Sequence, residues 1–121
     1  MKYQLEDRTI KFGQDIITLC RSAKIDIISR PIVTQLIRSG TSIGANYAEA
    51  NNASSKKDFR NKIYIAKKEA QETTYWLKIL KTCEPNNKLI DNCLLECKEI
   101  LLILQAITRK INSDNMKSTI V

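Results

Sequence analysis

The chain has 121 residues, a length that fits one domain and leaves little room for a deep active site. Glycine and proline number only 3 and 2, which disfavours turn-rich β architecture and fits long helices with few connections. The formal charge is +7, and such a field attracts polyanions such as RNA or DNA, although simple solubility is an equally ordinary reason for it. The first twelve residues lack the apolar run of a secretion signal, and no segment approaches the roughly 18 apolar residues of a membrane span, so we expect a cytoplasmic protein with reduced thiols.

Apolar residues spaced three and four apart predict a first helix over residues 5–23. A second helix is expected over residues 31–50, where Pro31 suits the first turn because proline lacks the N–H that has no helical partner there. This helix contains Gly40 and Gly44, each costing about 1 kcal/mol relative to alanine. We expect close helix packing at these glycines to offset the cost. The alternative is a helix that is weak or broken at this point.

The third predicted helix, over residues 55–82, has the strongest pattern in the chain. Ser55 and Asp58 resemble a capping box at its start. Its apolar positions keep the three/four spacing from Phe59 to Leu80, which is typical of the seam of a left-handed antiparallel bundle.

A fourth helix is predicted over residues 88–111, after a turn that contains Pro85. The four helices predict an all-α fold, an antiparallel up-down four-helix bundle that forms a single domain over residues 1–112. We expect residues 113–121 to be a flexible C-terminal tail, since they are polar and aperiodic.

A second apolar stripe on the third helix consists of Ile65, Trp76 and Ile79. A monomeric bundle needs one stripe per helix, and a further apolar patch usually marks contact with another chain. We therefore expect these residues at an oligomer interface. The alternative is that Trp76 only flanks the core of the monomer.

Residues suited to catalysis or metal binding are scarce. The chain has no histidine, which removes the commonest general base and metal ligand. Residues 39–44 contain two glycines but lie in a helical pattern, so they do not form a phosphate-binding loop. Cys93 and Cys97 are four apart and not in the paired spacing of zinc sites, and with Cys20 and Cys83 they fit small buried hydrophobes better. We expect no enzymatic activity, no metal and no cofactor.

A basic surface is predicted on the first half of the third helix. Cations with aromatic neighbours suit phosphate and base contacts, while a solvated helix face is an equally ordinary interpretation. The candidate nucleic-acid-binding residues are Lys56, Lys57, Arg60, Tyr64, Lys67 and Lys68.

A polar face is predicted on the second helix, opposite its apolar set. Arg38, Ser42, Asn46 and Glu49 lie within about 80° of one another around the helix axis. Such a face is either solvated or lines the shared surface of an oligomer.

The segment from Gln35 to Leu80 resembles a bacterial family, the four-helix bundle proteins also called 23S rRNA-intervening sequence proteins. The one departure is Ala50, where many members have glycine. The residues that carry the resemblance are Arg38, Ser42, Ile43, Asn46, Glu49, Lys57, Asp58, Phe59, Ile65, Ala66, Glu72, Trp76 and Leu77.

The resemblance implies a homopentameric ring with an axial channel, and it adds Glu72 to the polar face. Because it singles out the residues of this face, it also favours the interpretation that the face lines the shared surface of an oligomer. A distant relative, the accessory protein of diversity-generating retroelements, is a basic pentamer that binds a reverse transcriptase, with nucleic acid as an implied second partner. The expected function is therefore a non-enzymatic, basic homo-oligomer that binds RNA, DNA or a ribonucleoprotein partner, with a nucleic-acid enzyme such as a reverse transcriptase as a further expected partner. The alternative is a protein-interaction or structural oligomer with no role in nucleic-acid binding.

Overall fold

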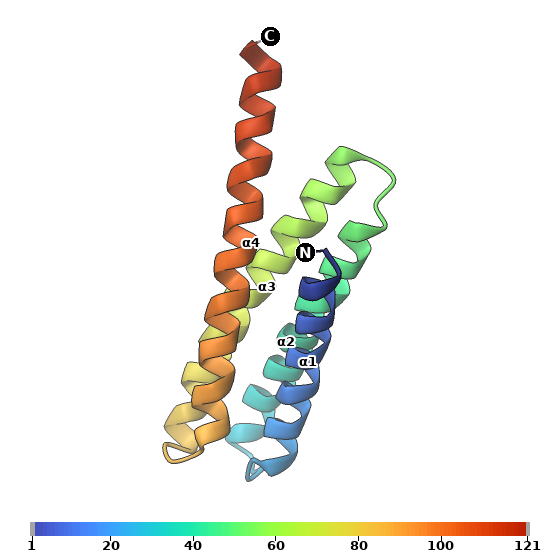
Figure 1. The fold of residues 1–121 in the computed structure, drawn as a ribbon. Helices are drawn as coiled ribbons and strands as arrows, with labels where there is room; N and C mark the ends of the chain where they lie inside the picture. Colours follow the sequence, from blue (N-terminus) through green and yellow to red (C-terminus); the bar gives the residue numbers. More distant parts are fainter. Residues whose placement is uncertain (1, 121) are drawn as a thin grey trace.

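The structure, a computed structural model, describes the backbone of residues 2–120 and the side chains of residues 4–114. The described part contains four helices and no strand. They are α1 (Lys2–Ser22), α2 (Ser29–Asn51), α3 (Lys56–Cys83) and α4 (Lys88–Ile120). Consecutive helices run in opposite directions, as Figure 1 shows. Each helix packs on its two neighbours, with α4 closing on α1, so the predicted antiparallel up-down four-helix bundle is confirmed.

The helix ends differ from the predictions mainly at α4. This helix continues nine residues beyond the predicted end at Ile111, so residues 113–120 extend the helix and do not form an irregular tail. No glycine or proline follows Ile111 to stop it. α2 begins two residues earlier than predicted, because the Asp26 carboxylate accepts the backbone N–H groups of Ile28 and Ser29 at 2.9 and 2.8 Å. These hydrogen bonds, the one from Ser29 first among them, hold the pKa of Asp26 below its usual value.

The core consists of the predicted seam residues of all four helices. Ile16, Leu36, Leu77 and Leu104 are fully buried between the helices. The buried threonine hydroxyls bond to carbonyls of their own helix, as in Thr73, which donates to the Glu69 carbonyl at 2.7 Å. The core therefore contains polar atoms without leaving these hydroxyls unsatisfied.

The two glycines of α2 allow it to approach α1 closely. A Cβ on Gly40 would lie 2.9 Å from Cγ1 of Ile16, and one on Gly44 would lie 3.0 Å from Oγ1 of Thr9. α2 runs without a break across both positions. Close packing at the glycines is confirmed, and the alternative of a broken helix is wrong.

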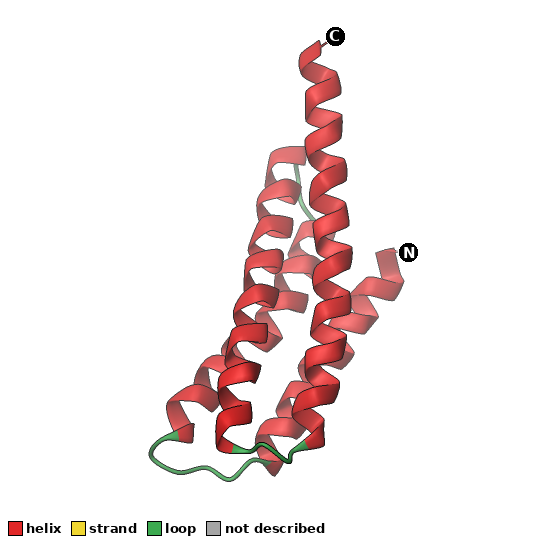
Figure 2. Ribbon diagram, turned by 90° about the vertical axis from the view of Figure 1, so that its left-hand side faces the viewer, coloured by secondary structure: helices red, strands yellow, loops and turns green. Residues whose placement is uncertain are grey.

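The four helices do not reach the same height. Figures 1 and 2 show that the first residues of α1 lie well below the loop that joins α2 to α3, while α4 extends above that loop. The upper end of the bundle, as far as the structure describes it, is therefore built from α2, α3 and α4, and the fourth corner is open there.

Candidate nucleic-acid interface

The basic surface begins at the first turn of α3. Ser55 caps the helix, because its hydroxyl oxygen accepts the backbone N–H of Asp58 at 3.0 Å. Lys56 and Lys57 follow directly and are exposed, and Arg60 lies one turn further on, half-buried. The cap thus fixes where the helix starts and places three cations at the upper end of the bundle.

No carboxylate among the described side chains forms an ion pair with this surface. We define the basic surface as the described side chains of Lys56, Lys57, Arg60, Lys67 and Lys68. None of them belongs to the ion pairs found among residues 4–114, which instead join cations elsewhere to acids. These pairs are Arg8–Glu96, Lys11–Asp15, Arg38–Glu69, Arg38–Glu72, Lys62–Glu49 and Lys81–Asp91.

Tyr64 lies between α3 and α4 and is held from both sides. Its hydroxyl donates to Oδ1 of Asn112 at 2.9 Å, and Nζ of Lys67 lies 5.3 Å from the centre of its ring. Of the two neighbouring cations Lys67 and Lys68, it is Lys67 that lies over this ring. An incoming base would have to displace Lys67 to reach the face that the cation covers.

A hollow of about 590 Å³ opens beside these cations. It is bounded by the loop that joins α2 to α3, the first turn of α3 and the part of α4 near Ile111. It lies at the upper end of the bundle, where the described part of α1 does not reach the fourth corner (Figures 1 and 2). The sequence contained no signal for it, because it depends on the relative heights of the helices.

The predicted polar face joins α2 to α3. The Arg38 guanidinium donates to Glu69 at 3.0 Å and also to Glu72, and the Trp76 indole N–H donates to Glu72 at 3.4 Å. The hydrogen bond from Arg38 lowers the pKa of Glu72 below its usual value, and the hydrogen bond from Trp76 acts in the same direction to a smaller extent. The structure thus brings Arg38 and Glu72 together with Glu69, a partner that the sequence did not single out. We call these three residues the Arg38 cluster.

The other polar-face residues do not join this cluster. Ser42 donates to the Arg38 carbonyl at 2.5 Å, and Asn46 donates to the Ser42 carbonyl at 2.8 Å, both within α2. Glu49 pairs with Lys62 of α3 at 2.7 Å. The polar face therefore includes both hydrogen bonds within one helix and ion pairs between helices.

The predicted interface residues differ in exposure. Ile65 is 41% exposed, while Trp76 is half-buried and packs against the core, as the alternative interpretation of this residue expects. Ile79 is also half-buried. Trp76 and Arg38 both donate hydrogen bonds to Glu72. Part of the second apolar stripe of α3 therefore lies beside the Arg38 cluster on the polar face.

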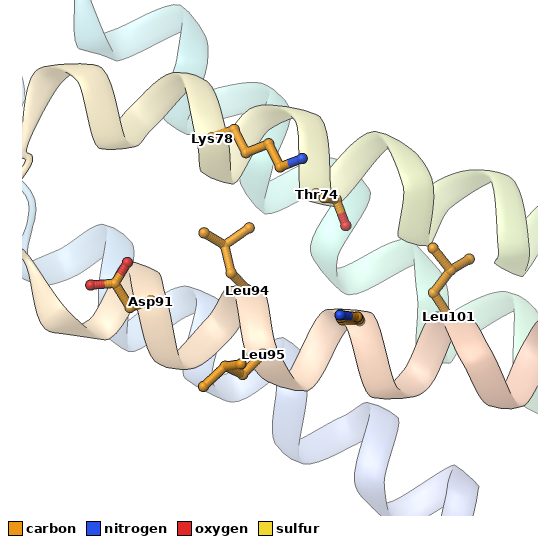
Figure 3. Close-up of a pocket in the computed structure, with 7 residues that line it drawn as sticks. Thr74, Lys78, Asp91, Leu94, Leu95 and Leu101 are labelled. Carbon is orange, nitrogen blue, oxygen red and sulfur yellow. The ribbon is translucent and has the colours of Figure 1, made fainter.

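A groove between α3 and α4 is lined by three leucines together with four polar or charged side chains. Figure 3 shows Leu94 and Leu101 directed from α4 towards α3, with Thr74 and Lys78 on the opposite wall. Leu95, at its edge, is 68% exposed. The sequence signal for this groove was that α4 is apolar over more than one face.

Three of the four thiols are placed as buried hydrophobic side chains, whereas Cys83 is exposed, contrary to the expectation for this residue. Cys20, Cys93 and Cys97 are buried, and burial raises the pKa of each to about 11. Within residues 4–114 no group of three or more cysteine, aspartate and glutamate side chains is placed to hold a metal ion. Among the described residues, no helix combines the length and apolarity that crossing a bilayer requires.

Comparison with known proteins supports the resemblance seen in the sequence. The sequence model of a family described as 23S rRNA-intervening sequence protein matches residues 1–106. A crystal structure of a protein with unknown function from the S23 ribosomal protein family of Bacteroides thetaiotaomicron is 36% identical. It superposes with a TM-score of 0.76 over 86% of this chain and 97% of that chain. A search of curated proteins finds no match. The chain therefore belongs to the 23S rRNA-intervening sequence protein family.

Proposed function

We propose that this protein is a non-enzymatic homo-oligomer whose basic surface binds RNA or DNA. The observation that carries the proposal is the basic surface itself. Five cations lie within four turns of one helix, and none forms an ion pair with a described carboxylate. Phosphate groups are the natural counter-charge for such a surface, and their contacts are largely independent of sequence.

Oligomerisation strengthens the proposed binding. A single bundle offers only a few phosphate contacts, whereas several linked copies raise the avidity without any new kind of contact. The exposed Ile65 and the neighbouring Arg38 cluster on the face of α2 and α3 are the proposed subunit contact. The family resemblance makes a pentamer the expected stoichiometry, and a reverse transcriptase or another nucleic-acid enzyme remains a predicted partner.

The test is a salt titration of binding to a random RNA and to a random duplex. In the variant Lys67→Glu/Lys68→Glu we expect weaker binding to both, because phosphate contacts carry no base information. The slope of log affinity against log salt should fall by about one for each phosphate that the variant no longer neutralises. The matched control is Lys24→Glu/Lys88→Glu, which makes the same charge change at the opposite end of the bundle.

Binding that is equally weakened by both double variants would indicate a general charge effect and contradict the assignment of the surface. Absence of binding by the unaltered protein at low salt would favour a protein-interaction function instead. The groove between α3 and α4 supports that second candidate, because the exposed Leu95 and the half-buried Leu94 and Leu101 offer an apolar surface to a partner (Figure 3). Exposed apolar surface can mark a protein contact.

A further inference from the structure

We propose that the hollow at the upper end of the bundle binds an unpaired base of a single strand, whose flanking phosphates contact the cations at its rim. This inference rests on the proposed nucleic-acid function and narrows it to single-stranded RNA or DNA. It gives Phe59 a function in ligand binding, in addition to its place in the apolar seam of α3.

The apolar wall of the hollow comes from two helices. Phe59 of α3 and Ile111 of α4 both pack against the core while remaining partly exposed, and both line the hollow. Phe59 is the aromatic residue among the lining side chains. Stacking of a base on an aromatic ring tolerates any sequence, because every base presents a π face.

The hollow is accessible because of the fold. The described part of α1 ends well below it, so α1 does not cover the inner sides of α3 and α4 at this height (Figures 1 and 2). Its volume of about 590 Å³ falls within the range of about 300–1,000 Å³ found for small-ligand pockets. A base can therefore enter a site that already exists.

The charged side chains around the hollow favour an anionic ligand. Lys56, Lys57 and Arg60 line the hollow together with one carboxylate, Asp114, so cations outnumber acids three to one. An apolar wall within a cationic rim fits a nucleotide, which joins a flat aromatic base, able to stack through its face, to an anionic phosphate. Bases in a duplex are paired and stacked, whereas single strands can turn bases outwards onto aromatic side chains.

The test measures binding of a fluorescein-labelled oligouridine and of a duplex of equal length to the full chain. Phe59→Leu keeps an apolar side chain in the core and removes the stacking ring. We expect it to lose at least about fivefold in affinity for the single strand and to leave duplex affinity unchanged. The matched control is Tyr75→Leu, which removes an aromatic ring that is 56% exposed on the same helix but outside the hollow. Circular dichroism melting checks that both variants fold.

A second measurement needs no variant. An oligonucleotide containing 5-iodouracil, irradiated on the unaltered protein, should cross-link to a peptide that contains Phe59. If both nucleic acids bind but Phe59→Leu equals the unaltered protein, or the cross-links lie only elsewhere, this inference fails while the proposed function stands. If neither nucleic acid binds at low salt, the proposed function fails and the inference with it. In that case the cationic rim would serve an acidic protein segment.

Discussion

Gly40 lies where α2 packs on α1, and Ile16 occupies the space that a methyl group would need there. The nearest Ile16 atoms include its Cβ at 3.4 Å, and a β-branched side chain has little rotamer freedom in a helix. The two helices would therefore have to separate to accept a larger residue. Gly13 differs, because a Cβ there would meet only Thr41 atoms at 3.8 Å, an ordinary contact distance.

This contrast predicts opposite effects of one substitution. Gly13→Ala should stabilise the protein by up to about 1 kcal/mol, the gain in helix propensity. Gly40→Ala has the same gain, but overpacking costs about 1–3 kcal/mol, so we expect a net loss of up to about 2 kcal/mol. Urea unfolding of the two variants measures both. A Gly40→Ala variant as stable as Gly13→Ala would mean that α1 and α2 can separate there at little cost.

Among the elements, α3 contributes both to the core and to the basic surface. Its seam packs between α2 and α4, and its first turn holds the cations beside the hollow. The Ser55 cap contributes to both, because its hydroxyl accepts the N–H of Asp58 and so fixes the position of the first turn. The start of this helix therefore positions the candidate site.

Removing the cap should weaken this element. Ser55→Ala should lower the free energy of unfolding by about 1 kcal/mol, since the N–H of Asp58 loses its side-chain acceptor. Ser55→Asp is the matched control, because its carboxylate can accept the same N–H and should retain most of the stability. Thermal unfolding compares the two. Equal stability of Ser55→Ala and the unaltered protein would show that water replaces the cap at no cost.

For the whole molecule, the prediction concerns assembly. Ile65 is 41% exposed on the proposed subunit contact, so Ile65→Glu should leave the bundle folded but place a charge in the contact. The control is Ile27→Glu, in the loop before α2, where the isoleucine is 85% exposed. Light scattering should give a multiple of 13.8 kDa for the unaltered protein and for Ile27→Glu, and a lower mass for Ile65→Glu. An unaltered protein of 13.8 kDa at micromolar concentration would contradict the proposed oligomer.

The amino-acid sequence by itself determined the helices, their order and most of the core. Ile16, Leu36, Leu77 and Leu104 lie inside, as their spacing predicted, because the 3.6-residue period is a local property of one helix. The basic surface at the start of α3 could also be predicted, because the positions of cations around one helix follow from their spacing in the sequence. The end of α4 was misjudged because polar residues without a stop signal can continue a helix.

The tertiary structure alone decided how the helices are placed against one another. The Arg38 side chain contacts Glu69 and Glu72, which are 31 and 34 residues away in the sequence. These contacts form because the packing of α2 against α3 brings the three residues to the same level along the bundle. The hollow beside Phe59 is bounded by the α2–α3 loop, the start of α3 and the part of α4 near Ile111, which lie far apart in the sequence and meet only in the fold. Spacing along a helix specifies which face a residue occupies, but the relative height of two helices follows from the packing of all their side chains together, which no local pattern contains.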